Sequence, residues 1–234
     1  MNPNPNRAPI ATALLHQLAD IAGRWPSPVV RRLHIPQRPG EPGEHDAEFC
    51  AIELEDGAFG LSYILLGGTL DRLLARHGSD RRDALAGADP MVLAQRLGDG
   101  DEVERAVALA AVNALTDSVW RRIGYTPPPA GNSLGDVVLG PQDHLGMIGF
   151  FPPLVRRVDE AGGRLTVVEM NAEMVARQQE RFPKVHITLD RAALADCSTV
   201  VGTSTMLLND SLDQMLAAAP AATRRLPRCG SDQR

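Results

Sequence analysis

The residues best suited to chemistry follow three short apolar runs in the second half of the chain. They are Gly149-Phe150, Glu169 and the hydroxyl run Thr203-Ser204-Thr205. An acid at a strand end is the group that binds ribose in dinucleotide folds. A hydroxyl cluster between a strand and a helix can bind an anion or a polar ligand through side chains and backbone N–H groups. If the chain has a small-molecule site, we expect part of it at these positions.

The elements that must position these residues form a predicted βαβ unit. Leu145–Phe150 is an apolar run typical of a buried strand, and Pro152 and Pro153 favour the first turn of a helix. Gly162-Gly163 ends that helix, and Leu165–Val168 predicts the second strand. Such a unit is right-handed and covered on both faces, and its ligands bind at the carboxyl ends of the strands.

Ordinary NAD binding is disfavoured, although Glu169 lies 20 residues after Gly149, as a ribose-binding acid would. The turn between the predicted strand and helix reads Phe-Phe-Pro-Pro over residues 150–153, where a dinucleotide site needs bare glycine backbone. Two phenylalanines crowd that approach and two prolines remove donors. The alternative for Glu169 is a solvated carboxylate at a strand end.

Two further polar features leave alternatives open. The run Thr203–Thr205 could bind a ligand or could cap the following helix. Asn113 interrupts an apolar stretch, and a buried amide without partners would cost about 1–3 kcal/mol. It either ties its helix to a neighbouring loop or faces a pocket at the domain junction.

Composition excludes several classes of protein. With 234 residues, 44% hydrophobic and 23% charged, and a formal net charge of -5, the chain resembles an ordinary globular protein and has no basic stripe for nucleic acid. No apolar run is long enough for a membrane span, and the three distant cysteines favour a cytoplasmic protein with reduced thiols. Paired Cys or His metal motifs and Walker A are absent from the sequence.

The first half of the chain predicts an α+β region. The apolar spacing indicates helices over 11–22, 70–75, 90–97 and 101–120, and strands over 47–54 and 59–65 joined by a turn at Asp56-Gly57. Residues 25–43 are expected to form a loop with a short extended piece at Val29-Val30. The segment Thr126–Asn132 predicts a linker.

The second half continues the βαβ pattern. A short helix or turn is expected over 136–139, helices over 172–182 and 208–219, a helical turn over 191–195, and strands over 185–187 and 198–202. Asn209 or Asp210 is the predicted N-cap of the last helix. The tail over 220–234 contains no apolar run for a further strand, and we expect it to be disordered or shifted in reading frame.

These motifs together resemble the family described as "putative heavy-metal chelation". The similar stretches are the hairpin AIELEDGAFGLSYILL, the helix ERAVALAAVNALTD, the strand and turn GMIGFFPPLVRRV, the strand end LTVVEMN and the segment VVGTSTMLLNDSLDQML. They cover roughly residues 45 to 219. Two positions depart from the family pattern. Where the family usually has an acid followed by a basic residue, Asn and Pro, this chain has Glu169-Met170-Asn171. In addition, the strand that follows the last helix in the family is expected to be missing here.

The resemblance implies an enolase-N-terminal-like α+β domain over 1–125, a linker over 126–135, and a Rossmann-like α/β domain with a partial parallel sheet over 136–219. It implies a ligand site in the cleft between the domains. The residues expected to line it are Asn113, Gly149, Phe150, Glu169, Asn171, Thr203, Ser204, Thr205 and Asn209. Glu169 would accept hydrogen bonds or help to bind a cation, and the hydroxyl run would hold an anionic or polar group.

Two functions follow as hypotheses from the resemblance and the residues. The first is a chelation or metal-complex-binding protein whose ligand is small and polar or metal-chelating, with a metal ion or metal chelate as cofactor. The second is a small-molecule enzyme that uses the same cleft with a nucleotide-like cofactor. A degraded, truncated member with little activity is a third. An uncovered sheet edge would also favour a homodimer.

Overall fold

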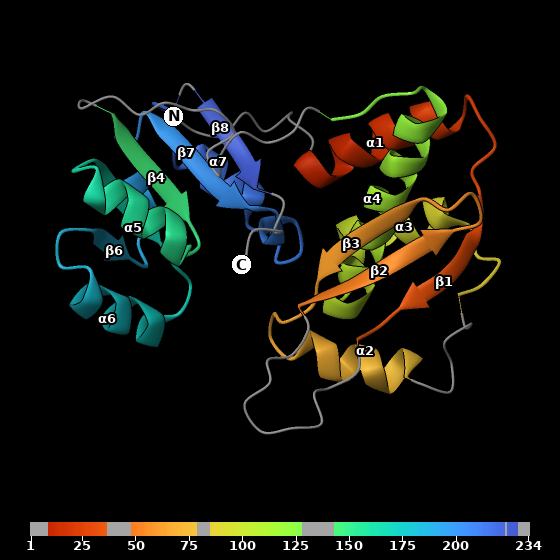
Figure 1. The fold of residues 1–234 in the computed structure, drawn as a ribbon, viewed down its shortest axis with the longest axis horizontal. Coiled ribbons are helices and arrows are strands. Elements are labelled where there is room, and N and C mark those ends of the chain that lie inside the picture. Colours follow the sequence, from red (N-terminus) through yellow and green to blue (C-terminus); the bar gives the residue numbers. More distant parts are fainter. Residues whose placement is uncertain (1–8, 37–47, 79–84, 128–142, 223, 229–234) are drawn as a thin grey trace. The chain divides into compact units, whose positions relative to one another are not determined.

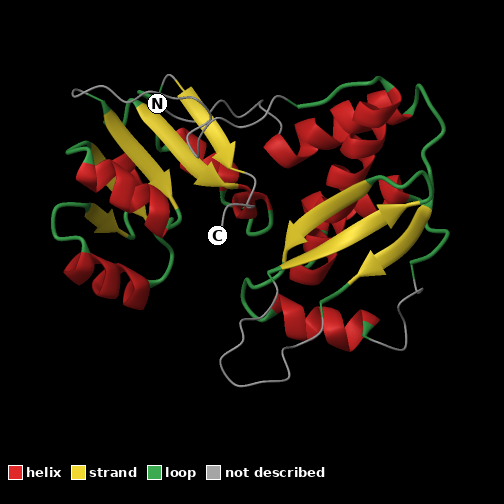
Figure 2. Cartoon of the chain, in the orientation of Figure 1, coloured by secondary structure: helices red, strands yellow, loops and turns green. Residues whose placement is uncertain are grey.

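The chain divides into two compact units, which we describe one at a time. The computed structural model describes residues 9–36, 48–78, 85–127, 143–222 and 224–228. One unit comprises Asn4–Pro127 with Leu207–Asn209, and the other comprises Pro128–Met206 and Asp210–Arg234 with the first three residues. The predicted fold class is confirmed: an antiparallel sheet with helices lies in the first part and a parallel sheet with helices in the second (Figures 1 and 2). No described helix is both long enough and apolar enough to cross a bilayer.

In its described residues, the N-terminal unit has a three-stranded antiparallel sheet and four α-helices. The sheet has the order β1-β2-β3. The elements are α1 (Ile10–Ala22), β1 (Val30–His34), β2 (Phe49–Leu54), β3 (Phe59–Tyr63), α2 (Thr69–His77), α3 (Pro90–Asp99) and α4 (Glu102–Arg122). The predicted hairpin is confirmed, because β2 and β3 pair antiparallel and Gly57 in the turn between them has a φ of 80°.

Strand β1 corrects part of the predicted loop over residues 25–43: the short extended piece expected at Val29-Val30 is the start of a strand that continues to His34. Val30 and Leu33 are both buried, yet they are three residues apart, which hides the alternation of a strand. The cause is an irregularity in the pairing with β2 between Val30 and Arg32, where a β-bulge adds one residue to the spacing. Such a bulge cannot be read from a hydrophobic pattern.

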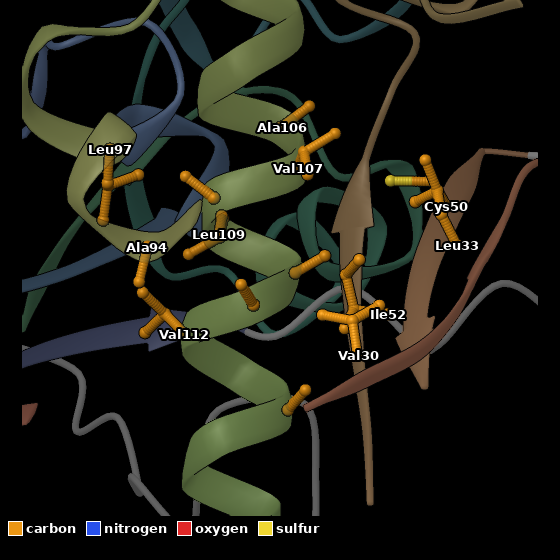
Figure 3. Close-up of a cluster of buried hydrophobic side chains, with 14 of the residues drawn as sticks. Val30, Leu33, Cys50, Ile52, Ala94, Leu97, Ala106, Val107, Leu109 and Val112 are labelled. Carbon is orange, nitrogen blue, oxygen red and sulfur yellow. The ribbon is translucent and has the colours of Figure 1, made fainter. Parts of the chain in front are cut away.

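Helix α4 forms the centre of the N-terminal core. It packs against α3 on one side and against β2 and β3 on the other. Figure 3 shows Leu109 on the side of α4 that is turned to Leu97 of α3. Val107 lies on the opposite side of the helix, the side on which Ile52 of β2 is found. The helix therefore carries buried residues around much of its circumference, as expected for a helix covered on two sides.

The contact between α4 and β3 is unusually close at Gly60. A Cβ atom at this position would lie 2.1 Å from both the carbonyl oxygen of Ala110 and the backbone nitrogen of Ala114. The small alanines of α4 and the bare glycine of β3 together let helix and strand backbones approach each other. Glycine is the residue type that permits this approach.

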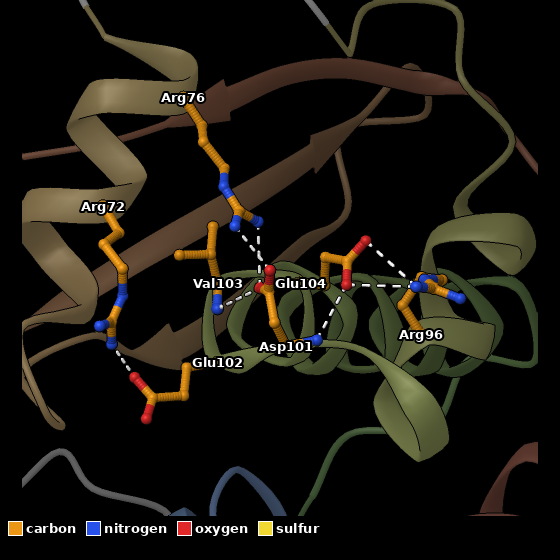
Figure 4. Close-up of polar contacts among 7 residues, drawn as sticks. All are labelled: Arg72, Arg76, Arg96, Asp101, Glu102, Val103 and Glu104. Carbon is orange, nitrogen blue, oxygen red and sulfur yellow. Dashed lines mark hydrogen bonds and ion pairs between the residues drawn. The ribbon is translucent and has the colours of Figure 1, made fainter.

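Charged residues stabilise the N-terminus of α4 (Figure 4). The Asp101 carboxylate accepts hydrogen bonds from the N–H groups of Val103 and Glu104, both at 3.0 Å, and the Glu104 side chain accepts from the Asp101 N–H at 2.8 Å. Arg76 donates to both Asp101 oxygens, at 3.0 and 2.6 Å. Hydrogen bonds from Arg76 and from the backbone lower the pKa of Asp101 to about 2.

We expect Asp101→Ala to lower the free energy of unfolding by about 1 kcal/mol at pH 7, because a helix cap is lost. The Arg76 pair adds little because both side chains are about half exposed. The Asp101 pKa lies below its ordinary value of 3.8, so the carboxylate's contribution is complete above pH 4 and is lost as the pH falls towards 2. Urea unfolding between pH 2 and 7 measures both effects. If Asp101→Ala kept the full acid dependence of the wild type, the contribution assigned to Asp101 would be wrong.

The C-terminal unit contains a parallel sheet with the strand order β6-β5-β4-β7-β8. Its elements are β4 (His144–Ile148), α5 (Pro152–Glu160), β5 (Arg164–Val168), α6 (Ala172–Arg181), β6 (His186–Thr188), β7 (Thr199–Thr203), α7 (Leu212–Ala217) and β8 (Arg224–Arg228), with 3-10 helices at Arg191–Leu194 and Ser204–Leu207. Leu145 and Met147 pack with α5, whereas Ile148 packs with Met215 of α7. Both sheet faces are thus covered, as predicted for a βαβ arrangement.

The expectation that no strand follows the last helix is wrong, because the structure has a strand at Arg224–Arg228. These residues form β8, which pairs with β7 in parallel from Thr199↔Arg224 to Thr203↔Arg228. An edge strand needs backbone pairing on one side only, and it tolerates a proline such as Pro227, so it requires no apolar run. Residues 229–234 lie outside the described part of the chain, as do residues 136–139 and most of the predicted linker.

His144 begins β4 and lies 2.8 Å from the Thr166 hydroxyl, measured from Nε2 to Oγ1. Burial lowers the pKa of His144 below its ordinary 6.5, and Arg164 lowers it further. The folded state therefore favours the neutral ring.

We expect the melting temperature of the C-terminal unit to fall as the pH drops below 6.5. His144→Gln keeps a hydrogen-bonding group without a titrating one, and we expect it to lose this pH dependence in calorimetry. An unchanged dependence in that variant would contradict the assignment.

Candidate functional site at the carboxyl edge of the parallel sheet

Three of the predicted segments meet at one edge of the parallel sheet. Strand β4 lies between β5 and β7, and Ile148 pairs with Val168 on one side and with Gly202 on the other. The next residues in the three strands are therefore Gly149, Glu169 and Thr203. The structure brings these three positions together, and the edge they occupy is the one at which parallel sheets bind ligands.

The Glu169 carboxylate connects two of these strand ends. Its Oε1 accepts the N–H of Phe150 at 2.5 Å, and its Oε2 accepts the N–H of Met170 at 3.1 Å. The Glu169 N–H itself donates to the Thr188 carbonyl at 2.9 Å. Glu169 is therefore a hydrogen-bond acceptor for the protein backbone. Sequence reasoning expected it to accept hydrogen bonds but could not identify Phe150 as a donor.

The turn between β4 and α5 has few N–H groups to offer. Gly149 has a φ of 84°, and its N–H donates to the Val168 carbonyl at 2.9 Å. The Phe150 N–H is used by Glu169, Pro152 and Pro153 have none, and Leu154 donates to the Phe151 carbonyl at 3.0 Å. A pyrophosphate cradle needs several N–H groups directed outwards at the start of the helix. The geometry agrees with the expectation that ordinary dinucleotide binding is disfavoured here.

The hydroxyl run lies next to this turn. Thr203 ends β7, and its Oγ1 accepts the N–H of Thr205 at 3.2 Å and lies 3.1 Å from the Thr205 hydroxyl. A Cβ placed on Gly149 would lie 3.5 Å from Cγ2 of Thr203, so the two strand ends are in contact. Ser204 begins the 3-10 helix and is partly exposed. The arrangement places the methyl group of Thr203 beside Gly149, at the start of the turn between β4 and α5.

Asn171 lies at the same edge and caps a helix. Its side-chain oxygen accepts the N–H of Met174 at 3.1 Å, which makes it the N-cap of α6. Met170, between Asn171 and Glu169, is 68% exposed. The segment 169–171 was expected at a strand end, but Met170 itself was not among the residues expected to line the site, and its exposed thioether is a further group at this edge.

Asn209 is not grouped with the strand ends. It belongs to the segment Leu207–Asn209, which clusters with the N-terminal unit. The prediction that Asn209 or Asp210 caps the last helix is wrong, because α7 begins at Leu212 with Ser211 as its N-cap. Asp210 has a φ of 58°, in the left-handed region, and this interrupts the helix that the apolar pattern had predicted.

Asn113 belongs to the N-terminal unit, in α4. Its Nδ2 donates to the Leu61 carbonyl in β3 at 2.8 Å. This contact agrees with the alternative in which Asn113 ties its helix to a neighbouring segment. That segment is strand β3 and not a loop. The prediction of a cleft between the domains stays a prediction, since the two units are described one at a time.

Family profiles and solved structures relate the chain to known proteins. Two family profiles match it, both described as "putative heavy-metal chelation", over residues 134–226 and 47–116. The chain is similar in structure to a protein of unknown function from the DUF364 family of Desulfitobacterium hafniense. The TM-score is 0.60 at 17% identity, over 93% of this chain and 78% of the other.

A second solved structure gives the same fold. It is a protein of unknown function from the DUF364 family of Pyrococcus horikoshii, with a TM-score of 0.60 at 15% identity, over 92% of this chain and 77% of the other. At these identities the likeness establishes the fold alone. No relative was found among curated proteins.

Proposed function

This chain belongs to the family described as "putative heavy-metal chelation", and we propose that it binds a small polar ligand, a metal complex or metal-chelating molecule, at the carboxyl edge of its parallel sheet. The observation that carries the proposal is that Glu169 and Thr203 directly follow the paired positions of the two strands that flank β4, at the same edge of the sheet. A carboxylate and adjacent hydroxyls offer acceptors and donors within one small area.

The geometry of the turn counts against the alternative of an enzyme with a nucleotide-like cofactor. Glu169 and the two prolines leave the start of α5 poor in N–H donors for phosphate. The same turn does not oppose a ligand recognised through hydroxyl and carboxylate groups. Ligand binding is therefore the function that this edge supports best.

Native mass spectrometry with elemental analysis of gently purified protein tests the proposal. We expect a stoichiometric small molecule or metal complex in the wild type, and its loss in Glu169→Ala. Glu173→Ala is the matched control, because Glu173 is an exposed acid in the first turn of α6, only four residues along the chain. Retention of the molecule in Glu169→Ala, or wild-type protein that retains nothing and takes up no metal complex, would contradict the proposal.

A further inference from the structure

The heavy metal that the family description implies does not fit the thiol groups of the described residues, and Met170 offers only a single exposed thioether at the edge. Soft metal ions prefer thiolate ligands. Cys50 and Cys197 are 1% and 0% exposed, and burial raises the pKa of Cys50 to about 12 and that of Cys197 to about 11. Both groups are therefore neutral, inaccessible thiols at neutral pH, and neither is a ready ligand.

Nitrogen and oxygen donors do not supply an inner coordination shell either. Within the described part of the chain, no three His, Cys, Asp or Glu side chains lie close enough together to share a metal ion. At the three central strand ends, Glu169 is the acid, and both of its oxygens already accept backbone N–H groups. One carboxylate with neighbouring hydroxyls is far from the ligand sets of bare transition-metal ions.

We infer that a metal binds at this edge as a complex whose coordination positions are filled by other ligands. The protein holds that complex by outer-sphere hydrogen bonds to the Glu169 carboxylate and to the hydroxyls of Thr203 and Thr205. The inference rests on the proposed function and names its ligand class. It requires no bond between a protein atom and the metal.

The remaining hydrogen-bonding capacity of Glu169 supports this mode of binding. A carboxylate has about four acceptor positions. Two of them are occupied by the N–H groups of Phe150 and Met170, which fix the carboxylate in place. The others can accept hydrogen bonds from ammonia or water molecules bound to a metal. Hydrogen bonds to a charged acceptor are among the stronger ones.

The charge at the three strand ends favours a cationic or neutral complex over an anionic one. The segments 149–154 and 169–174, which surround Phe150 and Glu169, contain Glu169 and Glu173 but no lysine or arginine, whereas Arg228 of β8 pairs with Thr203 on the far side of β7. The N–H groups of Phe150 and Leu154 are already donated within the protein, so they cannot compensate an incoming negative charge. The site therefore differs from a phosphate site in both charge and donors.

Hexaamminecobalt(III) is a suitable probe, because it is cationic, rich in N–H donors, diamagnetic and inert to ligand substitution. We would titrate it into 15N-labelled protein and compare it with Cd²⁺ alone. We expect it to shift the amide signals of Phe150, Met170 and Thr203–Thr205, and we expect Cd²⁺ to leave them in place. Glu169→Gln keeps an oxygen for the Phe150 N–H but loses the charge, and we expect it to weaken binding of the probe about tenfold.

Glu160→Gln is the matched control for charge, because Glu160 is an exposed acid at the far end of α5, and we expect its affinity for the probe to stay within about twofold of the wild type. Equal weakening in both variants, or no shift at the named amides, would overturn the inference, since the probe would then be a general counterion or would not bind. Shifts of the same amides by Cd²⁺ alone would also overturn it but would leave the proposed function standing. The proposed function fails separately, if native mass spectrometry finds no retained ligand and no uptake.

Discussion

Replacing Gly60 by alanine is expected to lower the free energy of unfolding of the N-terminal unit by about 3 kcal/mol or more, since overpacking of this kind forces backbone to move. The new Cβ would lie 2.1 Å from two backbone atoms of α4, and a backbone cannot turn aside as the end of a side chain can. Strand β3 would have to move away from α4, which would also stretch the hydrogen bond from Asn113 to Leu61. Urea unfolding followed by circular dichroism measures the loss.

Gly98→Ala is the matched control for this prediction. Gly98 lies in α3 with no atom within 4 Å of its Cβ position. Alanine there is expected to stabilise the helix by about 0.5–1 kcal/mol, because glycine is a poor helix former. If Gly60→Ala were as stable as the wild type, the close approach of β3 and α4 would be wrong.

Ile52→Ala is expected to lower the free energy of unfolding by about 2–5 kcal/mol, the range for a large side chain removed from a core. Ile52 is 0% exposed in β2 and pairs with Gly60, so it lies on the sheet face that α4 covers. The lost methyl groups leave a cavity between two rigid elements that cannot collapse easily.

Leu61→Ala is the control on the other face of the same sheet. Leu61 directly follows Gly60 in β3 and is 58% exposed. Its truncation is expected to change the free energy of unfolding by no more than about 0.5 kcal/mol, as at other surface positions. Equal losses in the two variants would show that the assignment of the buried face is wrong, because a register shift of one residue exchanges the two faces.

The parallel sheet could be predicted because its strands are buried on both faces. Leu145–Ile148 and Leu165–Val168 read as continuous apolar runs with a proline-initiated helix between them, and no tertiary information is needed to recognise that pattern. The same reasoning placed Gly149, Glu169 and Thr203 at one edge, since parallel strands end on the same side. The long helix α4 could be predicted because small apolar residues continue through most of the stretch that forms it.

The elements that were missed depend on pairing or on single backbone angles. Strand β1 contains a bulge between Val30 and Arg32, and β8 is an edge strand formed by Arg-Arg-Leu-Pro-Arg. The late start of α7 follows from the left-handed conformation of Asp210. None of these leaves a periodic pattern in the sequence.

Within the candidate site, residue positions could be predicted but hydrogen-bond partners could not. The sequence shows that Glu169 closes a strand, and only the structure shows that its carboxylate holds the backbone of the neighbouring strand end. The partner of Asn113 is likewise a carbonyl group 52 residues away in the chain. Such contacts depend on the exact packing of distant segments, which a single sequence does not encode in a local pattern.

Each of the two units contains a buried thiol that can report when that unit transiently opens. Among the described residues, the N-terminal unit contains Cys50 and the C-terminal unit contains Cys197, and both are almost inaccessible in the folded state. An alkylating reagent can therefore modify either residue only in molecules whose corresponding unit has transiently opened. Peptide mapping of the modified sites over time would then give two separate opening rates in one native sample, without denaturant and without any introduced label.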